Sequence, residues 1–472
     1  MRVFSVPLSA PFLRSVIAAL IDGRLVAGFE ARTNPAKLAD ATLYLPTRRA
    51  VRVAREVFLE ELKTDAAVLP RITPLGDIDE DELAFAEEAE QFAGAAAMDI
   101  PPRLGELDRR LTLAKLVAAW SKGEVLAPLV VGGPASTLAL ASDLARLMDD
   151  MVTRGVAWEA LDGLVPDQLD QYWQYSLEFL RIARKLWPDH LAEIGKIEPA
   201  ARRDLLIEAE AARLSVHHKG PVIAAGSTGS MPATAKFLHA MAQLKQGAVV
   251  LPGLDVDLDE DAWQAIAGER DAHGKFTAPP ASNHPQFAMH ALLQRFGLVR
   301  DDVEILVPPA PHGRDTLLSE AMRPSNATAE WHARLKQAGT ATKISAGMDQ
   351  LAVIEAPNAE MEALAIAVAM REARHLDKTA ALVTPDRALA RRVMAALERW
   401  NLDFDDSGGD ALIETPAGTF ARLAAEAVAK GLEPPTLLAL LKHPLLRLGR
   451  NGNAFSGAIS SLELALLRGT RP

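Results

Sequence analysis

The stretch VFSVPLSAPFLRSVIAAL, residues 3–20, sets the pattern for the first half of the chain. Its apolar beginning predicts a buried strand, and Phe12, Val16, Ala19 and Leu20 recur at the spacing of an amphipathic helix. The loop PLSAP joins the two elements. A strand, a loop and a helix in this order form the frame in which many α/β proteins hold a nucleotide phosphate.

The loop itself lacks the residues that bind phosphate. A phosphate loop needs glycines, because they let backbone N–H groups approach the oxygens, together with a lysine and a Ser or Thr for magnesium. The segment PLSAPFLRS contains neither glycine nor lysine. We therefore interpret Arg14 and Ser15 as parts of a degenerate nucleotide loop. The sequence predicts no catalytic residue, no metal site and no bound cofactor for this chain.

Further strands and helices follow the opening in a regular order. ATLYLP predicts a second strand, TRRAVRVAREVFLEEL the helix after it, and AVLPRITPLGDI a third strand. Such strand–helix units imply a parallel sheet with right-handed crossovers. Residues 79–214 predict helices alone, after which GPVIAAGSTGSMPATAKFLHAMAQLKQGAVVLPGLD returns to strand, loop, helix and strand. The first α/β domain is therefore expected to be interrupted by a helical insertion.

A second α/β unit is predicted after a proline-rich passage. Pro308, Pro309 and Pro311 disfavour regular structure and indicate a linker. Beyond it, LAVIEAP and TAALVTP are the expected strands. Asn358 is the expected cap of the helix between them. The negative charges of Glu360 and Glu362 would stabilise the positive N-terminal end of that helix.

Composition and charge exclude several classes of protein. At 472 residues the chain is too long for one ordinary core, and the absence of cysteine excludes disulfides, thiolate zinc sites and iron–sulfur clusters within it. A formal charge of -11 argues against a globally basic nucleic-acid binder but leaves a local basic groove open. No apolar run approaches the roughly 20 residues of a membrane span, so we expect a cytoplasmic protein without a membrane partner.

Several sequence blocks, in one order, carry a resemblance to a known family. They are LYLPTRRAVRVAREVF, GSTGSMPATAKFLHAMAQL, GAVVLPGLD, HPQFAMHALLQRFG, AALVTPDRALARRVMAAL and LLALLKHPLLRLG. With the order of strands and helical insertions, the chain resembles superfamily-one DNA helicases of the UvrD/RecB type. More closely, it resembles the AddB subunits of alphaproteobacterial AddAB helicase–nucleases. The resemblance extends over essentially the whole chain.

The resemblance implies an α/β fold of RecA-like, P-loop NTPase-type parallel-sheet domains with large all-helical insertions. AddB-type proteins are longer and end in a nuclease domain with acidic metal ligands and iron–sulfur cysteines, so the chain is expected to be an N-terminal fragment. The implied division is residues 1–78 and 215–307 for the first RecA-like domain, 79–214 for its helical insertion, 308–348 for the linker, 349–415 for part of the second RecA-like domain, and 416–472 for the start of a second insertion.

The same resemblance implies a function and its partners. The chain is expected to be a non-catalytic module that binds and scans single-stranded DNA during double-strand break repair by homologous recombination. The AddA subunit and single- and double-stranded DNA are the implied partners; ATP, magnesium and the iron–sulfur cluster belong to the full helicase–exonuclease complex. Two alternatives stay open: an active ATP-dependent helicase subunit or other α/β enzyme, and a scaffold that only docks AddA.

Three segments are candidates for DNA contact. LPTRR follows a strand and begins a helix, where a Thr cap, exposed N–H groups and arginines suit phosphate. GSTGS follows another strand, at the edge where open α/β sheets bind ligands. TPDRALARR repeats the arrangement of a strand end and a helix start. The candidate residues are Thr47, Arg48, Arg49 and Arg52 in the first segment, Ser227 and Thr228 in the second, and Thr384 and Arg387, with Arg391 and Arg392, in the third. Each segment is also compatible with a plain capped helix or tight turn.

Three other residue patterns that partly match ligand-binding motifs are better explained without a ligand. Asp255, Asp257 and Asp259 have the alternate spacing of a calcium loop, but Glu260 and Ile266 occupy its required glycine and acidic positions, so a solvated acidic loop is expected. The neighbouring His217 and His218 point in different directions on a helix and do not suggest a metal pair. The aromatic residues in QYWQY, Tyr172, Trp173 and Tyr175, suit packing better than base stacking.

Overall fold

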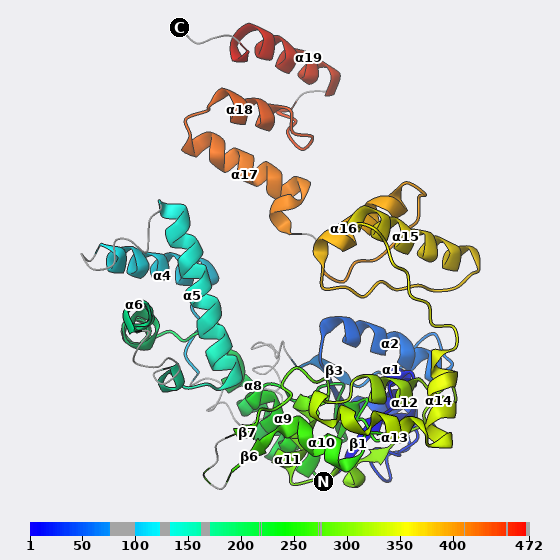
Figure 1. Cartoon of the computed structure of the whole chain (residues 1–472). Coiled ribbons are helices and arrows are strands. Elements are labelled where there is room, and N and C mark those ends of the chain that lie inside the picture. Colours follow the sequence, from blue (N-terminus) through cyan, green and yellow to red (C-terminus); the bar gives the residue numbers. More distant parts are fainter. Residues whose placement is uncertain are drawn as a thin grey trace. The chain divides into compact units, whose positions relative to one another are not determined.

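The structure is a computed structural model that describes residues 1–75, 100–122, 133–161, 170–216, 218, 220–271, 273, 276–409, 411–449 and 452–468. The chain forms two compact units, Met1–Leu351 and Ala352–Pro472, which are described separately (Figure 1). Among the described residues, no helix combines the length and the apolar character that a membrane crossing requires.

A six-stranded parallel sheet forms the centre of the first unit, in the order β3-β2-β4-β5-β1-β8. Its strands are β1 (Val3–Val6), β2 (Thr42–Leu45), β3 (Arg71–Pro74), β4 (Val222–Ala225), β5 (Gly247–Pro252) and β8 (Glu304–Ile305). The predicted parallel sheet is confirmed, and β4 pairs with β2 although the helical segment separates the two strands in sequence. This arrangement is compatible with a RecA-like layout.

Helices cover both faces of this sheet. Phe4 and Val6 point toward α1 (Phe12–Ile21) and α2 (Arg48–Leu62), whereas the alternate residue Val3 points to the opposite face. That opposite face is covered by α8 (Pro199–Val216), α9 (Pro232–Gln243), α10 (Glu260–Ala267) and α11 (Phe287–Phe296), drawn in green in Figure 1. Burial on both faces explains why the strands are continuous apolar runs rather than alternating ones.

The described residues between β3 and β4 form a series of helices, as the sequence predicts. It contains α4 (Glu106–Ser121), α5 (Pro134–Arg154), α6 (Asp170–Arg181), a π-helical turn (Ile182–Leu186) and α7 (Trp187–Ile194). These helices have a core of their own, in which Trp187 is fully buried among residues such as Leu113 and Leu144. In contrast, Ile207 and Leu214 of α8 join the core beneath the sheet, so α8 packs as part of the sheet layer. The helix expected in DELAFAEEAEQF lies outside the described residues.

The segment expected to be a linker is largely helical. Residues 308–313 lack regular structure, but α12 (Arg314–Ala321), α13 (Trp331–Leu335) and α14 (Ala338–Met348) follow them. These helices belong to the first unit. A short antiparallel hairpin, β6 (Glu269–Arg270) and β7 (Phe276–Ala278), also extends this unit.

The second unit is helical in its described residues. It contains α15 (Ala359–His375), α16 (Arg387–Glu398), α17 (Pro416–Ala429), α18 (Pro434–Leu441) and α19 (Gly452–Leu462). The Asn358 cap is confirmed, because its side chain accepts a hydrogen bond from the Met361 N–H. The strands predicted in LAVIEAP and TAALVTP are wrong: both segments lack strand pairing, and Val353 and Val383 are 85% and 94% exposed. Apolar sequence alone does not make a strand when no neighbouring strand pairs with it.

Candidate nucleic-acid interface

The first candidate group lies where β2 ends and α2 begins. Thr47 has an extended backbone, and its hydroxyl accepts a hydrogen bond from the Ala50 N–H at 3.1 Å. The predicted Thr47 cap is therefore confirmed. The apolar residues Val51, Ala54 and Phe58 bury one face of α2, which leaves the arginines on the solvent side. The exposed arginines of the first two turns are Arg48, Arg49 and Arg52.

Arg48 and Arg49 are exposed but already have polar or ring partners within the protein. A ligand at this helix start would compete with those contacts. The geometry nevertheless combines cationic side chains with the backbone N–H groups of the first helical turn, which is the arrangement that binds phosphate oxygens at many helix N-termini.

The second candidate group lies beside the first because β4 is paired with β2. Tyr44 aligns with Ala224, so the GSTGS loop emerges next to Pro46. Gly226 has a φ of +84°, and a Cβ there would lie 3.3 Å from Pro46 Cδ. Ser227 and Thr228 are half-buried, and the Ser227 hydroxyl accepts a hydrogen bond from the Gly229 N–H at 3.3 Å. The structure thus brings two candidate segments from distant parts of the sequence to one edge of the sheet.

The loop after β1 has contacts that do not resemble a phosphate site. The Ser15 hydroxyl is largely buried and donates a hydrogen bond to the Pro11 carbonyl at 3.0 Å. Arg14 pairs with Glu60 and lies 3.7 Å from a carboxylate oxygen of Glu61, both on α2. Arg14 therefore links α1 to α2, whereas Ser15 forms its hydrogen bond within the first turn of α1.

Leu8, within the loop after β1, lies against Gly253. A Cβ added to Gly253, at the end of β5, would lie 2.3 Å from Leu8 Cδ2. Gly253 has a φ of +67°, so this position favours glycine for two reasons, backbone conformation and the close leucine. The side chain of Leu8 fills space at the very edge of the sheet where a phosphate loop would need open backbone.

The third candidate group belongs to the second unit, and its residues bind one another. The Thr384 hydroxyl accepts a hydrogen bond from the Asp386 N–H at 3.0 Å, and Asp386, rather than Thr384, caps α16. Arg387 forms a two-point ion pair with Asp406, with N–O distances of 3.0 and 2.7 Å. Arg391 lies 3.7 Å from Glu414. These cations are therefore held by acidic neighbours.

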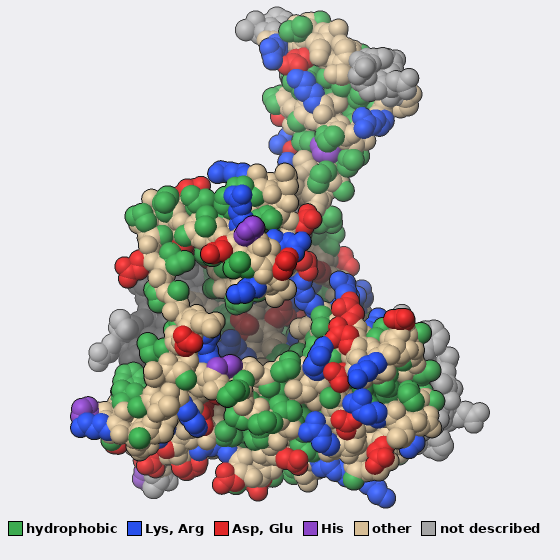
Figure 2. All heavy atoms as spheres, turned by 90° about the vertical axis from the view of Figure 1, so that its right-hand side faces the viewer, with side chains coloured by type: hydrophobic (Ala, Val, Ile, Leu, Met, Phe, Trp, Pro, Cys, Tyr) green, Lys and Arg blue, Asp and Glu red, His purple; other side chains and the backbone are tan. Residues whose placement is uncertain are grey.

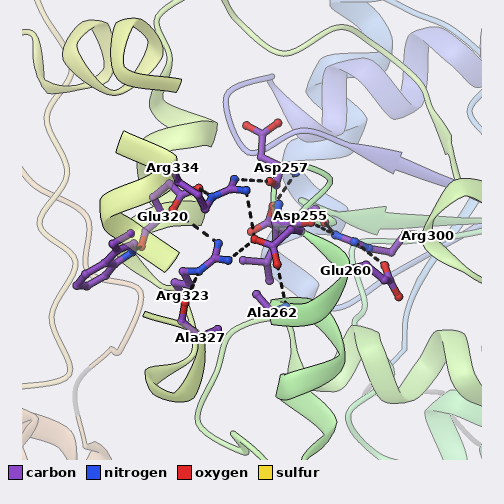
Figure 3. Close-up of polar contacts among 12 residues, drawn as sticks. Asp255, Asp257, Glu260, Ala262, Arg300, Glu320, Arg323, Ala327 and Arg334 are labelled. Atoms are coloured by element: carbon purple, nitrogen blue, oxygen red, sulfur yellow. Dashed lines mark hydrogen bonds and ion pairs between the residues drawn. The ribbon is translucent and has the colours of Figure 1, made fainter. Parts of the chain in front are cut away.

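The expectation that the acidic loop is solvated is wrong. Ion pairs and hydrogen bonds connect this loop to other parts of the first unit. Asp259 caps α10 and pairs with Arg323 and Arg334. These two arginines, labelled in Figure 3, come from the segment after α12. The Arg323 side chain is only 1% exposed. On the other side of the loop, Arg300 donates to the carbonyl oxygens of Asp255 and Leu258 at 3.1 and 2.6 Å. The acidic loop therefore fastens residues 314–348 to the sheet domain.

These contacts change the pKa of Asp259. Partial burial opposes its ionisation, but the Ala262 N–H and the guanidinium groups of Arg323 and Arg334 outweigh burial and lower the pKa of Asp259 below its ordinary value. No group of three or more His, Asp or Glu side chains among the described residues is arranged to hold a metal ion.

The remaining sequence candidates contribute little. His218 Nδ1 lies 2.9 Å from the Leu214 carbonyl oxygen, a contact within the end of α8. His217 and the side chains of Tyr172, Trp173 and Tyr175 lie outside the part of the chain whose side chains are described. On the face drawn in Figure 2, basic and acidic side chains are interspersed over the surface. On this face, a DNA contact would therefore have to be local.

Sequence reasoning missed a cavity of about 540 Å³ in the first unit. Its wall includes Asp315, Leu318, Ser319 and Met322 from one face of α12. Their spacing of three and four residues is a helical signal that could have been found. This helical spacing does not stand out in the sequence, because the prolines before Arg314 favour a linker.

A scan against models of known protein families finds no match, and a search of curated proteins finds no significant relative.

Proposed function

We propose that the chain is a non-catalytic, helicase-like module that binds single-stranded DNA at the carboxyl edge of β2 and β4. The observation that carries the proposal is the juxtaposition of two segments, the capped and arginine-bearing start of α2 and the GSTGS loop. Both lie at the edge where open α/β sheets bind ligands.

The proposed contacts are to the DNA backbone. N–H groups at the start of α2 and the guanidinium groups of Arg48, Arg49 and Arg52 would meet phosphate oxygens, with Arg48 and Arg49 giving up their present contacts within the protein. The hydroxyls of Ser227 and Thr228 would add neutral hydrogen bonds. Such contacts position a strand without selecting its sequence. We therefore expect binding that depends strongly on salt and weakly on base composition.

The proposal assigns no ATP hydrolysis to the chain. The loop after β1 has no glycine or lysine, Arg14 is paired with carboxylates of α2, and Leu8 lies against Gly253. A nucleotide phosphate would find none of the groups that usually neutralise it. The resemblance to AddB subunits provides the setting that we propose: double-strand break repair, with an AddA-type partner supplying translocation.

Fluorescence anisotropy with a labelled oligo(dT) at two salt concentrations, with and without ATP and magnesium, tests the proposal. The wild-type protein should bind in an ATP-independent manner. The double variant Arg48→Ala/Arg49→Ala should reduce the slope of log K against log salt by about 1.4, the change expected when two phosphate contacts are lost. The matched control is Arg146→Ala/Arg181→Ala, which removes two exposed arginines from the helical insertion.

The possible results separate the competing functions. Equal losses in the two double variants would mean that only net charge matters, and would contradict a site at α2. Absence of DNA binding by the wild type would favour a docking scaffold. Binding that requires ATP would favour an active helicase subunit.

A further inference from the structure

The cavity next to α12 lies at the carboxyl ends of β1, β5 and β8, within the first unit. Pro7 and Leu8 follow β1, Gly253 and Leu254 follow β5, and Val307 follows β8. Its volume of about 540 Å³ falls in the range of small-molecule sites, which are usually several hundred Å³. The cavity is separate from the edge of β2 and β4.

The walls of the cavity are mainly apolar, and some of these side chains are unusually exposed. Leu8 is 61% exposed, Val256 56%, Leu318 44% and Met322 47%. Large apolar side chains gathered around a concave surface indicate a ligand site more strongly than scattered ones do.

Two residues of the cavity lining, Asp315 and Ser319, each have a polar atom that is covered by the protein and has no hydrogen-bond partner. Ser319 is 4% exposed, and its hydroxyl oxygen has no hydrogen-bond partner. One turn earlier on α12, Asp315 Oδ1 accepts a hydrogen bond from the Ser9 N–H at 3.2 Å, whereas Asp315 Oδ2 is buried and unpartnered. Unpaired buried polar atoms are costly, so a carboxylate oxygen and a hydroxyl on one helical face suggest a missing donor.

The charges that face the cavity have one sign. Asp255, Asp257 and Asp315 line it, and its lining contains no Lys or Arg. His284 is the remaining titratable group: burial lowers its pKa despite its contact with the Met322 carbonyl and the nearby Asp255. His284 Nε2 lies 2.7 Å from that carbonyl oxygen, and Nδ1 accepts from the Gln286 N–H at 3.1 Å, which satisfies a neutral imidazole. The cavity therefore repels anions such as nucleotides.

We propose that this cavity binds a small amphiphilic organic cation, a protonated primary amine attached to an apolar body. A small rotation of the Asp315 and Ser319 side chains would expose Oδ2 and Oγ to the cavity, where the ammonium group would donate to both. The apolar body would cover Leu8, Leu318 and Met322. An ammonium group has three donors and no acceptor, which suits a carboxylate and an unpaired hydroxyl. This site is independent of the proposed DNA interface, since its acidic lining disfavours phosphate.

Isothermal titration calorimetry with three probes of one shape tests the site: 4-phenylbutylamine, 4-phenylbutan-1-ol and 4-phenylbutyrate. The amine should bind at least about tenfold more tightly than the alcohol, as expected for a charge-assisted hydrogen bond, and the carboxylate should bind most weakly. Equal binding of amine and alcohol, tightest binding of the carboxylate, or no binding of the amine at millimolar concentration would overturn the proposal.

Two variants locate the amine within the cavity. Asp315→Asn should weaken amine binding by about tenfold and leave alcohol binding unchanged, whereas the charge-matched control Asp301→Asn, on an exposed residue, should alter neither. Ser319→Ala removes only the hydroxyl and should also weaken amine binding, so the test survives if Asp315→Asn misfolds. An unchanged amine affinity in Ser319→Ala and Asp315→Asn would refute the site, and neither variant should alter oligo(dT) binding.

Discussion

Arg323 joins two parts of the first unit through side-chain contacts that are almost completely hidden from solvent. Its guanidinium pairs with Asp259 and donates to the Ala327 carbonyl at 2.8 Å, and Glu320 lies 3.7 Å away. Asp259 could be found in the sequence as an acidic residue, but its role could not. The spacing of Asp255, Asp257 and Asp259 carries no information about arginines that follow some sixty residues later.

Replacing Arg323 by Met should lower the free energy of unfolding by about 2–3 kcal/mol, because Asp259 and Glu320 would lose a buried partner. Urea denaturation monitored by circular dichroism measures this loss. The control Arg146→Met removes an exposed arginine paired only within α5 and should change stability by less than about 0.5 kcal/mol. Similar midpoints for both variants would contradict the role assigned to Arg323.

The lowered pKa of Asp259 predicts a contribution to stability that depends on pH. A carboxyl with a lower pKa in the folded state stabilises the protein above its unfolded pKa, near 4, and this contribution disappears as the pH falls through the folded value. Between about pH 5 and 3, wild type should therefore lose stability more steeply than Asp259→Asn. Asp261→Asn, in the same helical turn, is the control. Parallel pH profiles for wild type and Asp259→Asn would be inconsistent with this assignment.

At the scale of elements, sequence patterns predicted the parallel sheet well because its strands are buried on both faces. The apolar runs around Phe4, Leu43, Ile223 and Val250 all became strands. The same reasoning failed at Val353 and Val383, since an apolar run does not reveal whether another strand lies beside it. It also failed for α12 to α14, whose preceding prolines suggested a linker although later residues pack on the acidic loop.

The cap of α2 gives a prediction for a single element. Thr47→Ala should cost about 1 kcal/mol of stability, because the Ala50 N–H loses its acceptor, whereas Thr47→Ser should be nearly neutral. Thermal unfolding measures both. If the start of α2 also binds DNA, Thr47→Ala should weaken oligo(dT) binding more than Thr415→Ala, which removes the equivalent cap from α17. Equal DNA affinities in the two variants would argue against the interface.

At the scale of the whole molecule, the sequence placed the start of the second α/β unit at residue 349, close to the division between the two compact units. The division falls at residues 351 and 352, within the first strand expected for the second α/β unit. Leu351, Val353 and Ile354 are exposed there, at 56%, 85% and 63%. The two neighbouring candidate segments of the first unit were predictable individually, whereas their proximity depends on the pairing of β2 with β4.

The exposed segment between the units should be an early site of proteolysis. Thermolysin cuts before large apolar residues, so limited digestion should cleave first at Leu351, Val353 or Ile354, which mass spectrometry can identify. Replacing these three residues by aspartate should slow that cut without affecting later ones. A first cut within residues 232–267, which contain α9, β5 and α10 of the buried sheet layer, would contradict the division into units.

The order of strands in the sheet has a consequence for how the protein is made. Val3 pairs with Val249, and Thr42 pairs with Val222, so the earliest strands emerge from the ribosome long before their central neighbours. At ordinary rates of translation, β1 waits on the order of 10–50 s for β5. During that interval only β2 and β3 can pair, so the apolar faces of α1 and α2 are incompletely covered and are available to chaperones. Nascent-chain folding should therefore remain incomplete until the ribosome has passed β5, however early the N-terminal helices form.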